Sequence, residues 1–178
     1  MQKHHILLIK IFCILALAVL CGAKINTQPF SLSDKARKML AGKQILYVER
    51  HQYASDHHNT ATIFQYGEIN QNSFSQGGAI KIYDVDSGKT RTLINTDTGN
   101  LRDPEISFDG KRVIFSMRMN KEDDYHIYEI GIDGSNLKQL TSAKGVSDID
   151  PLYLPDGGIV FTSTRQPKYC MCNRHIMG

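Results

Sequence analysis

The stretch DPEISFDGKRVIFSMR, residues 103–118, returns further along the chain as DPLYLPDGGIVFTSTR, residues 150–165. The two copies lie 47 residues apart at both ends. Each copy reads as Asp-Pro, a short apolar strand, an Asp-Gly turn, and a second strand that ends in Arg118 or Arg165. A fixed period of this length is typical of stacked supersecondary units rather than of one globular core.

The residues between the two copies complete the repeating unit. DYHIYEIGIDGSNLKQLT, residues 124–141, supplies two further strands around Asp133 and Gly134. Four strands joined by tight turns in about 40 to 50 residues match the period of a β-propeller blade. The sequence therefore predicts an all-β protein, a partial β-propeller of about three incomplete four-stranded antiparallel blades.

A degenerate copy precedes these two. ILYVER (45–50) matches the second strand of the unit, and AIKIYDVDSGKTRTLI (79–94) matches the third and fourth. Blade one therefore lacks a first strand of its own, and the last copy stops after its second strand and one loop. We expect the propeller part to span 44–178, with blade one at 44–94, blade two at 103–141 and blade three, truncated, at 150–178.

This arrangement leaves an open ring. A propeller protects its strand edges by closing a ring of typically four to eight blades, and three partial blades cannot close one. We therefore expect the chain to be the N-terminal part of a longer protein, whose remaining blades or downstream domains are its partners. A second interpretation is a short protein that pairs its open edges with a protein partner.

The first residues predict a secretory signal. Lys3 and Lys10 precede an apolar run of ten residues, 11–20, and small residues follow Cys21. The run is about half the ~20 apolar residues that cross a bilayer. We expect a signal peptide at 1–23 and a periplasmic or secreted protein. A lipoprotein attached to the membrane through Cys21 is the alternative.

A linker with a short helix is predicted at 24–43. In SLSDKARKMLAG (31–42), Ser31 or Ser33 is placed to cap the helix, and Gly42 to end it in a left-handed conformation. One face of the helix is apolar, and we expect it to pack on a blade; it consists of Leu32, Ala36, Met39 and Leu40.

The charge of the chain excludes one class of partner. Of the 21 Lys and Arg residues, Lys3 and Lys10 fall in the predicted signal, which leaves 19 against 18 Asp and Glu. The remaining basic residues are spread between strands and turns, whereas phosphate backbones are bound by a clustered basic face. No nucleic-acid partner is predicted.

The repeats predict which loops share a face. Residues 51–78, 119–124 and 166–178 occupy the same slot, between the second and third strands of successive blades. This slot lies at the same end of a blade as the loop that enters its first strand, so the acidic residues Asp103, Asp148 and Asp150 are expected near the same rim. Binding and catalytic residues concentrate on loops held by a rigid scaffold, so we expect chemistry at this end.

Two of these loops carry metal-ligating residue types. Cys170 and Cys172 offer two sulfur ligands with His175 three residues on, a set that suits zinc or copper. Asp56, His57 and His58 on the long loop are candidates to complete the ligand set. Two alternatives remain open: a disulfide within the C-x-C pair, or two ordinary buried thiols.

The other patterns in the sequence do not predict a functional site. Cys170 to His175 does not supply the C-x-x-C-H motif of c-type haem attachment, so no covalent haem is predicted. His126, in the third strand of its blade, reads as a satisfied sheet residue. The Asp-Pro pairs read as structural turn carboxylates. No pair of residues has a spacing that predicts a catalytic centre, and the catalytic residues stay unknown.

The repeat as a whole resembles that of TolB-type periplasmic β-propellers, over most of residues 45–165, in its Pro-containing first strand, (Pro/Phe)-Asp-Gly turn, Ile-Tyr strand and closing Leu-Thr. A narrower resemblance lies in DHHNTATIFQYGEIN, SDIDPLYLPDGG and KYCMCNRHIMG, which look like secreted proteins related to the hydrazine synthase alpha subunit. That subunit is a multihaem enzyme, and its haem-binding regions have no counterpart in this sequence. The resemblance implies a propeller scaffold and carries over no catalytic residue.

Two functions follow as hypotheses, and the sequence does not settle whether the chain is an enzyme. In the first, a secreted propeller module binds a ligand, metal or partner domain on the loop face built from 51–78 and 166–178. In the second, the chain is the N-terminal fragment of a metal- or haem-dependent redox enzyme related to the hydrazine synthase alpha subunit.

Overall fold

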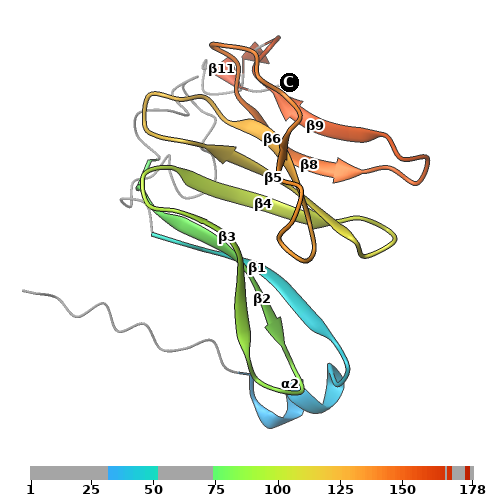
Figure 1. Ribbon diagram of the computed structural model, residues 1–178. Helices are drawn as coiled ribbons and strands as arrows, with labels where there is room; N and C mark the ends of the chain where they lie inside the picture. Colours follow the sequence, from blue (N-terminus) through green and yellow to red (C-terminus); the bar gives the residue numbers. More distant parts are fainter. Residues whose placement is uncertain (1–31, 52–73, 167, 170–174, 177–178) are drawn as a thin grey trace, which may run out of the picture. The chain divides into compact units, whose positions relative to one another are not determined.

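The computed structural model describes residues 32–51, 74–166, 168–169 and 175–176. These residues form antiparallel β-sheets and one short helix, and the chain from Ser33 onward makes one compact unit (Figure 1). The predicted signal peptide, 1–23, lies outside the described residues. Among the residues described, no helix has the length and apolar character needed to cross a membrane.

The first sheet has three strands. Its strands pair in chain order and antiparallel, and they are β1 (Gln44–Arg50), β2 (Gly78–Asp84) and β3 (Thr90–Thr96). The β2–β3 turn is held by Asp84, whose Oδ1 accepts hydrogen bonds from the amide of Ser87 at 2.8 Å and from its hydroxyl at 2.7 Å. A side-chain oxygen here takes the place of a backbone carbonyl in holding the turn.

The second sheet is a four-stranded meander. Its strands also pair in chain order, and they are β4 (Asn100–Ile106), β5 (Arg112–Arg118), β6 (His126–Gly131) and β7 (Lys138–Gln139). The Asp-Gly pairs predicted as turns do join β4 to β5 and β6 to β7. Gly110 and Gly134 there have φ of +69° and +89°, which a residue without a Cβ adopts at no steric cost.

The third sheet has two strands, β8 (Asp148–Tyr153) and β9 (Ile159–Ser163), and a separate small hairpin follows as β10 (Lys168–Tyr169) and β11 (His175–Ile176). β8 repeats a local irregularity of β4. In both strands the register shifts at the Asp-Pro pair, where Asp103 and Asp150 have φ of +51° and +55°. The Asp-Pro pairs are therefore bulges inside strands and not turns, which corrects the expectation from sequence.

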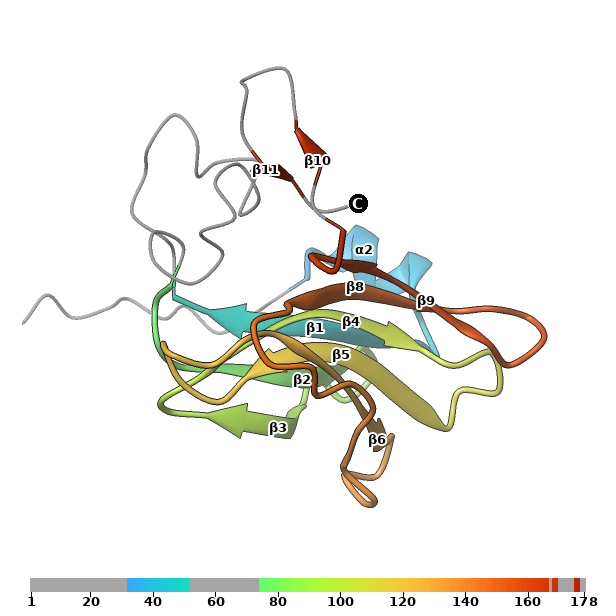
Figure 2. The same ribbon diagram turned by 90° about the horizontal axis from the view of Figure 1, so that it is seen from above.

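Successive sheets pack face to face in chain order (Figure 2). Side chains alternate across a strand, so neighbouring residues of β5 face different sheets. Val113 and Phe115 pack with Ile80 and Ile82 of the first sheet. Ile114 packs instead with Tyr153 of the third sheet, in a second apolar layer with Ile127, Ile159 and Phe161. The predicted all-β fold of antiparallel, propeller-like sheets is confirmed.

The helix α2 (Asp34–Met39) begins where the sequence indicated, because the Ser33 hydroxyl accepts the amide of Ala36 at 3.3 Å. It contacts the first sheet through Arg37, whose guanidinium lies 6.0 Å from the Tyr83 ring and donates to the Val85 carbonyl at 3.1 Å. Met39, predicted on the packed face, is 75% exposed. A helix of six residues presents too little apolar surface, so an arginine guanidinium makes the contact instead.

Candidate ligand-binding loop face

Most of the predicted metal ligands fall outside the described residues, namely His57, His58, Cys170 and Cys172. His175 is described only as backbone in β11, opposite Tyr169 of β10. The described residues contain no group of three His, Cys, Asp or Glu side chains placed to hold a metal ion. The zinc or copper site therefore stays a prediction from sequence.

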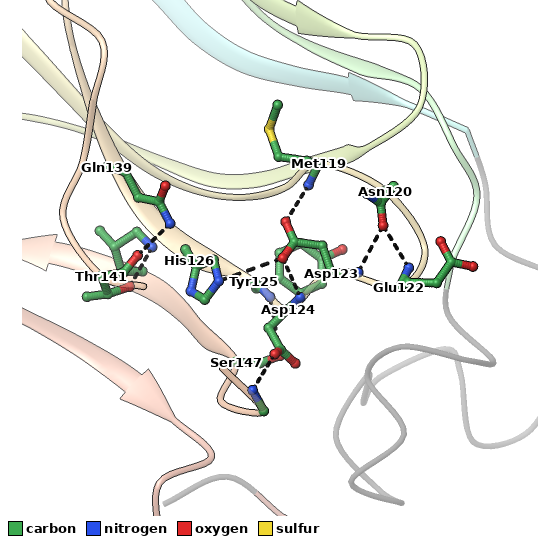
Figure 3. Close-up of polar contacts among 12 residues, drawn as sticks. Met119, Asn120, Glu122, Asp123, Asp124, Tyr125, His126, Gln139, Thr141 and Ser147 are labelled. Carbon is green, nitrogen blue, oxygen red and sulfur yellow. Dashed lines mark hydrogen bonds and ion pairs between the residues drawn. The ribbon is translucent and has the colours of Figure 1, made fainter. Parts of the chain in front are cut away.

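The loop between β5 and β6, residues 119–124, is held by its own side chains (Figure 3). Asn120 Oδ1 accepts the amides of Glu122 at 2.9 Å and Asp123 at 3.0 Å. Asp123 Oδ2 accepts the amide of Met119 at 3.0 Å, and its Oδ1 accepts that of Asp124 at 3.0 Å. These bonds satisfy backbone donors that the sheet leaves unpaired, and they give the loop a defined shape.

This loop is joined to the segment that leads into β8. Asp124 Oδ2 accepts the amide of Gly145 at 2.7 Å, and the carbonyl of Tyr125 accepts the amide of Asp148 at 2.8 Å. The loop between the second and third strands of one sheet therefore lies beside the loop that enters the next sheet. The alignment of the repeats predicted this arrangement. It brings residues about 20 positions apart in sequence together at one end of the sheets.

A pocket of about 540 Å³ opens between these two loops. We call it the loop pocket. Its lining includes three acidic side chains and one basic one, and consists of Glu122, Asp123, Asp124, His126, Ser142, Lys144 and Gly145. Its volume is that of a site for a small molecule rather than for a bare ion.

His126 is the buried member of the loop pocket. It begins β6 and is 6% exposed, with its Nε2 lying 3.8 Å from Asp123 Oδ1 (Figure 3). Its Nδ1 has no hydrogen-bond partner in the described structure. The sequence indicated a satisfied sheet residue: the imidazole does lie in the sheet with Asp123 beside its Nε2, but its Nδ1 is not satisfied by any described residue. A buried unpaired nitrogen costs about 1–3 kcal/mol.

The arginines that close the second strands are structural. Arg165 donates from Nη1 and Nη2 to the two carboxylate oxygens of Asp148, at 2.5 and 2.9 Å, and Ser163 adds a hydroxyl bond at 2.7 Å. Asp148 is completely buried at the start of β8. Arg118 occupies the position of Arg165 in the preceding sheet. It is completely buried, and its guanidinium lies 5.0 Å from the Tyr125 ring. Sequence reasoning missed both roles, although the recurrence of Arg at this position was visible.

The other two aspartates predicted at the rim lie further along their strands. Asp103 and Asp150 border a groove of about 370 Å³ between β4 and β8, together with Pro104, Glu105, Pro151, Leu152, Val160, Phe161 and Thr162. The carboxylate of Asp103 pairs with Nε of Arg102 beside it. Only Asp148 stands at the rim itself. Asp103 and Asp150 are displaced from it because each occupies the bulge of its strand.

These features define a class of protein, an all-β protein of stacked, propeller-like antiparallel sheets with a pocket at its loop end. No family model matches the chain. The chain is similar to hydrazine synthase subunit alpha of Kuenenia stuttgartiensis, with 33% identity over 84 residues, which are 47% of this chain and 10% of that protein.

Two solved structures are also similar. TolB from Acinetobacter baumannii matches with a TM-score of 0.40 and 25% identity, over 56% of this chain and 26% of its own. Kuenenia stuttgartiensis hydrazine synthase matches with a TM-score of 0.44 and 22% identity, over 71% of this chain and 17% of its own. Both resemblances stated from the sequence are therefore found. The chain spans about a tenth of the length of the curated relative.

Proposed function

We propose that this chain is a periplasmic or secreted β-propeller module that binds a ligand, metal or partner domain on its loop face. The loop face consists of the loop pocket and of the loops 51–78 and 166–178. The observation that carries the proposal is the pocket between the loops 119–124 and 141–147, whose lining includes three carboxylates. A rigid sheet scaffold that holds an acidic, histidine-containing pocket at one end has the form of a binding site.

The metal arm of this proposal, in which the loop face binds a metal ion, rests on the types of residue in its loops. Cys170 and Cys172 form a C-x-C pair, and His57, His58 and His175 are the candidate nitrogen ligands. Thiolate and imidazole ligands together select zinc or copper. We assign the site to one face because the two ligand-bearing loops, 51–78 and 166–178, occupy the same slot of the repeat.

Elemental analysis tests the metal arm. The purified full chain is compared with a Cys170→Ser/Cys172→Ser variant after both are dialysed against a weak chelator. We expect about one zinc or copper per wild-type chain and a large loss in the variant, since thiolates supply most of the affinity. Equal metal content in the two proteins would reject these ligands, and a mass lower than that of the reduced chain by two hydrogen atoms would identify the disulfide instead.

A second function is favoured by one observation, the sequence match to hydrazine synthase subunit alpha. In that case the chain is the N-terminal part of a metal- or haem-dependent redox enzyme. Sequencing the reading frame beyond Gly178 separates the two functions. C-x-x-C-H motifs downstream support the redox enzyme, whereas further blades alone support the binding module.

A further inference from the structure

Two adjacent strands of the second sheet fill the apolar layer that faces the first sheet. β5 contributes Val113 and Phe115, and the neighbouring strand β6 contributes Tyr128 and Ile130. All four side chains are at most 6% exposed. Phe115 lies opposite Tyr128, with the two rings stacked and their centroids 6.0 Å apart, and Val113 lies opposite Ile130.

The layer between the second and third sheets lacks half of such a set. Ile159 and Phe161 of β9 stand where Val113 and Phe115 stand in β5, as the matching registers of β9 on β8 and of β5 on β4 show. They pack on Ile114 of the second sheet but stay only partly buried. Among the described residues, no strand lies beyond β9 to supply counterparts of the two β6 side chains.

The free edge of β9 also lacks the residues that protect an edge strand. Exposed edges usually carry charges or proline, or are very short. The outer strand of the second sheet, β7, has two residues, one of them Lys138, and the outer strand of the first sheet, β3, carries Arg91. β9 has five residues, with neither a charge nor a proline. Its composition is that of a strand paired on both sides, as β5 is.

We propose that the free edge of β9 binds an extended peptide strand in which an aromatic residue is followed two positions later by an aliphatic one. Strand addition pairs the main-chain groups of the edge, and alternate side chains give the specificity. In the antiparallel register of β6 on β5, the aromatic side chain lies opposite Phe161 and the aliphatic one opposite Ile159. This inference goes beyond the proposed function, because it concerns the edge of the third sheet and not the loop face.

A second copy of this chain does not supply such a strand. If two β9 strands pair antiparallel with their Phe161 rings opposite each other, Ile159 of each faces the polar Ser163 of the other. If Phe161 faces Ile159 instead, the two rings are no longer opposite. β6, which has the required pattern, is already paired on both sides by β5 and β7. The occupant is therefore a peptide segment of the stated pattern.

Fluorescence anisotropy with synthetic peptides tests the inference on the full chain. The probe is HIYEIGI, residues 126–132, which carries Tyr128 and Ile130 at the required spacing. The matched control is HIEYIGI, which has the same composition but moves the aromatic residue to the other face of the strand. We expect saturable binding of the probe and about tenfold weaker binding of the control, because its ring is not buried against Phe161.

Hydrogen exchange and two protein variants locate the bound peptide. We expect the amides of 159–163 to exchange more slowly when the probe is bound, and those of β3 and β7 to be unchanged. Phe161→Leu keeps an apolar side chain but removes the ring, so it should weaken binding of the probe by about three- to tenfold. Val160→Thr, on the opposite face of β9, is the control and should stay within about twofold of wild type.

Loss of fold does not explain a difference between the two peptides, because both are measured on the same wild-type protein. Absence of saturable binding, equal binding of the permuted peptide, or protection at another sheet edge overturns the inference. So does a dimer that protects 159–163 without any peptide, because the occupant would then be a second copy of the chain. None of these results bears on the loop face, whose metal content is measured separately.

Discussion

The hydroxyl of Tyr153 in β8 donates a hydrogen bond of 2.8 Å to Oε2 of Glu129 in β6. This bond joins the third sheet to the second. The same carboxylate oxygen accepts Nη1 of Arg112 at 3.2 Å, and the Arg112 guanidinium lies 5.5 Å from the Tyr153 ring. A polar network therefore lies beside the apolar layer between the two sheets, and it defines how they align.

Removing the Tyr153 hydroxyl should weaken the fold. We expect Tyr153→Phe to lower the free energy of unfolding by about 1.5–3 kcal/mol, because the bond it loses is to a charged group. Urea denaturation measures the change. Tyr128→Phe, at another buried tyrosine, is the control and should cost less than the Tyr153 variant. Combining Tyr153→Phe with Glu129→Gln should cost less than the sum of the two single changes, and simple additivity would contradict the contact.

Tyr153 also predicts a pH dependence. Burial, and then the hydrogen bond to Glu129, raise the pKa of its phenol above the ordinary value. The protonated phenol is the form that the fold favours, so its contribution is complete below the unfolded pKa of about 10 and declines as the pH rises above it. We expect stability to fall more steeply between about pH 10 and 11 in wild type than in Tyr153→Phe. Parallel slopes in denaturation curves over this range would be the contrary result.

The turn aspartates predict the behaviour in acid. The Ser87 hydroxyl lowers the pKa of Asp84, and the Ser107 hydroxyl lowers that of Asp109, in each case as the largest cause. A lowered folded pKa gives stability that is present above the unfolded value and is lost as the pH falls through the folded one. We expect Ser107→Ala to raise the pKa of Asp109 toward its ordinary value, measured by carboxyl NMR titration.

A third turn supplies the internal comparison for that experiment. At Asp133 the largest cause of the lowered pKa is the backbone amide of Ser135, and the Ser135 hydroxyl comes second. Ser135→Ala keeps the amide bond, so it should raise the pKa of Asp133 by less than Ser107→Ala raises that of Asp109. Equal shifts in the two variants would show that the hydroxyls do not dominate at Asp109.

The Asp148–Arg165 pair predicts that truncating each of its two side chains lowers the unfolding free energy by a different amount. Arg165→Ala leaves a completely buried carboxylate with only the Ser163 hydroxyl, so we expect a loss of about 2–4 kcal/mol in unfolding free energy. Asp148→Ala leaves an arginine that is 42% exposed and free to turn toward water, so it should cost less despite the cavity. Thermal and urea unfolding compare the two variants. A larger loss in Asp148→Ala would contradict this account of the rim.

Two glycines should differ in how well they tolerate an added methyl group. A Cβ at Gly99 would lie 2.1 Å from the backbone carbonyl oxygen of Arg118, which cannot move without breaking the β4–β5 pairing. Gly99→Ala should therefore reduce the yield of folded protein severely. Gly110→Ala meets no atom within 4 Å and should cost only about 1 kcal/mol for its left-handed φ. Similar yields of the two variants would count against the close approach at Gly99.

Local patterns in the sequence were enough for much of the fold. The repeat placed the strand pairs, and Ser33 marked the start of the helix because capping depends on adjacent residues alone; Gly42 is left-handed as expected but lies two residues past the C-cap, Leu40. The same patterns misplaced Asp103 and Asp150, since a bulge is recognised only from the register of the partner strand. At the loop pocket, the sequence indicated the correct end of the blades but classed His126 as satisfied.

Sequence by itself determined the antiparallel sheets, their order and their turns, because alternation of apolar residues and Asp-Gly pairs act over a few neighbouring positions. Tertiary structure alone decided that Nδ1 of His126 has no partner among the described residues, that Arg165 reaches Asp148, and that Tyr153 reaches Glu129. The reason is physical: a hydrogen bond forms only where donor and acceptor lie within a few tenths of an ångström of about 2.9 Å, and these positions are reached only after the strands have paired and the sheets have packed.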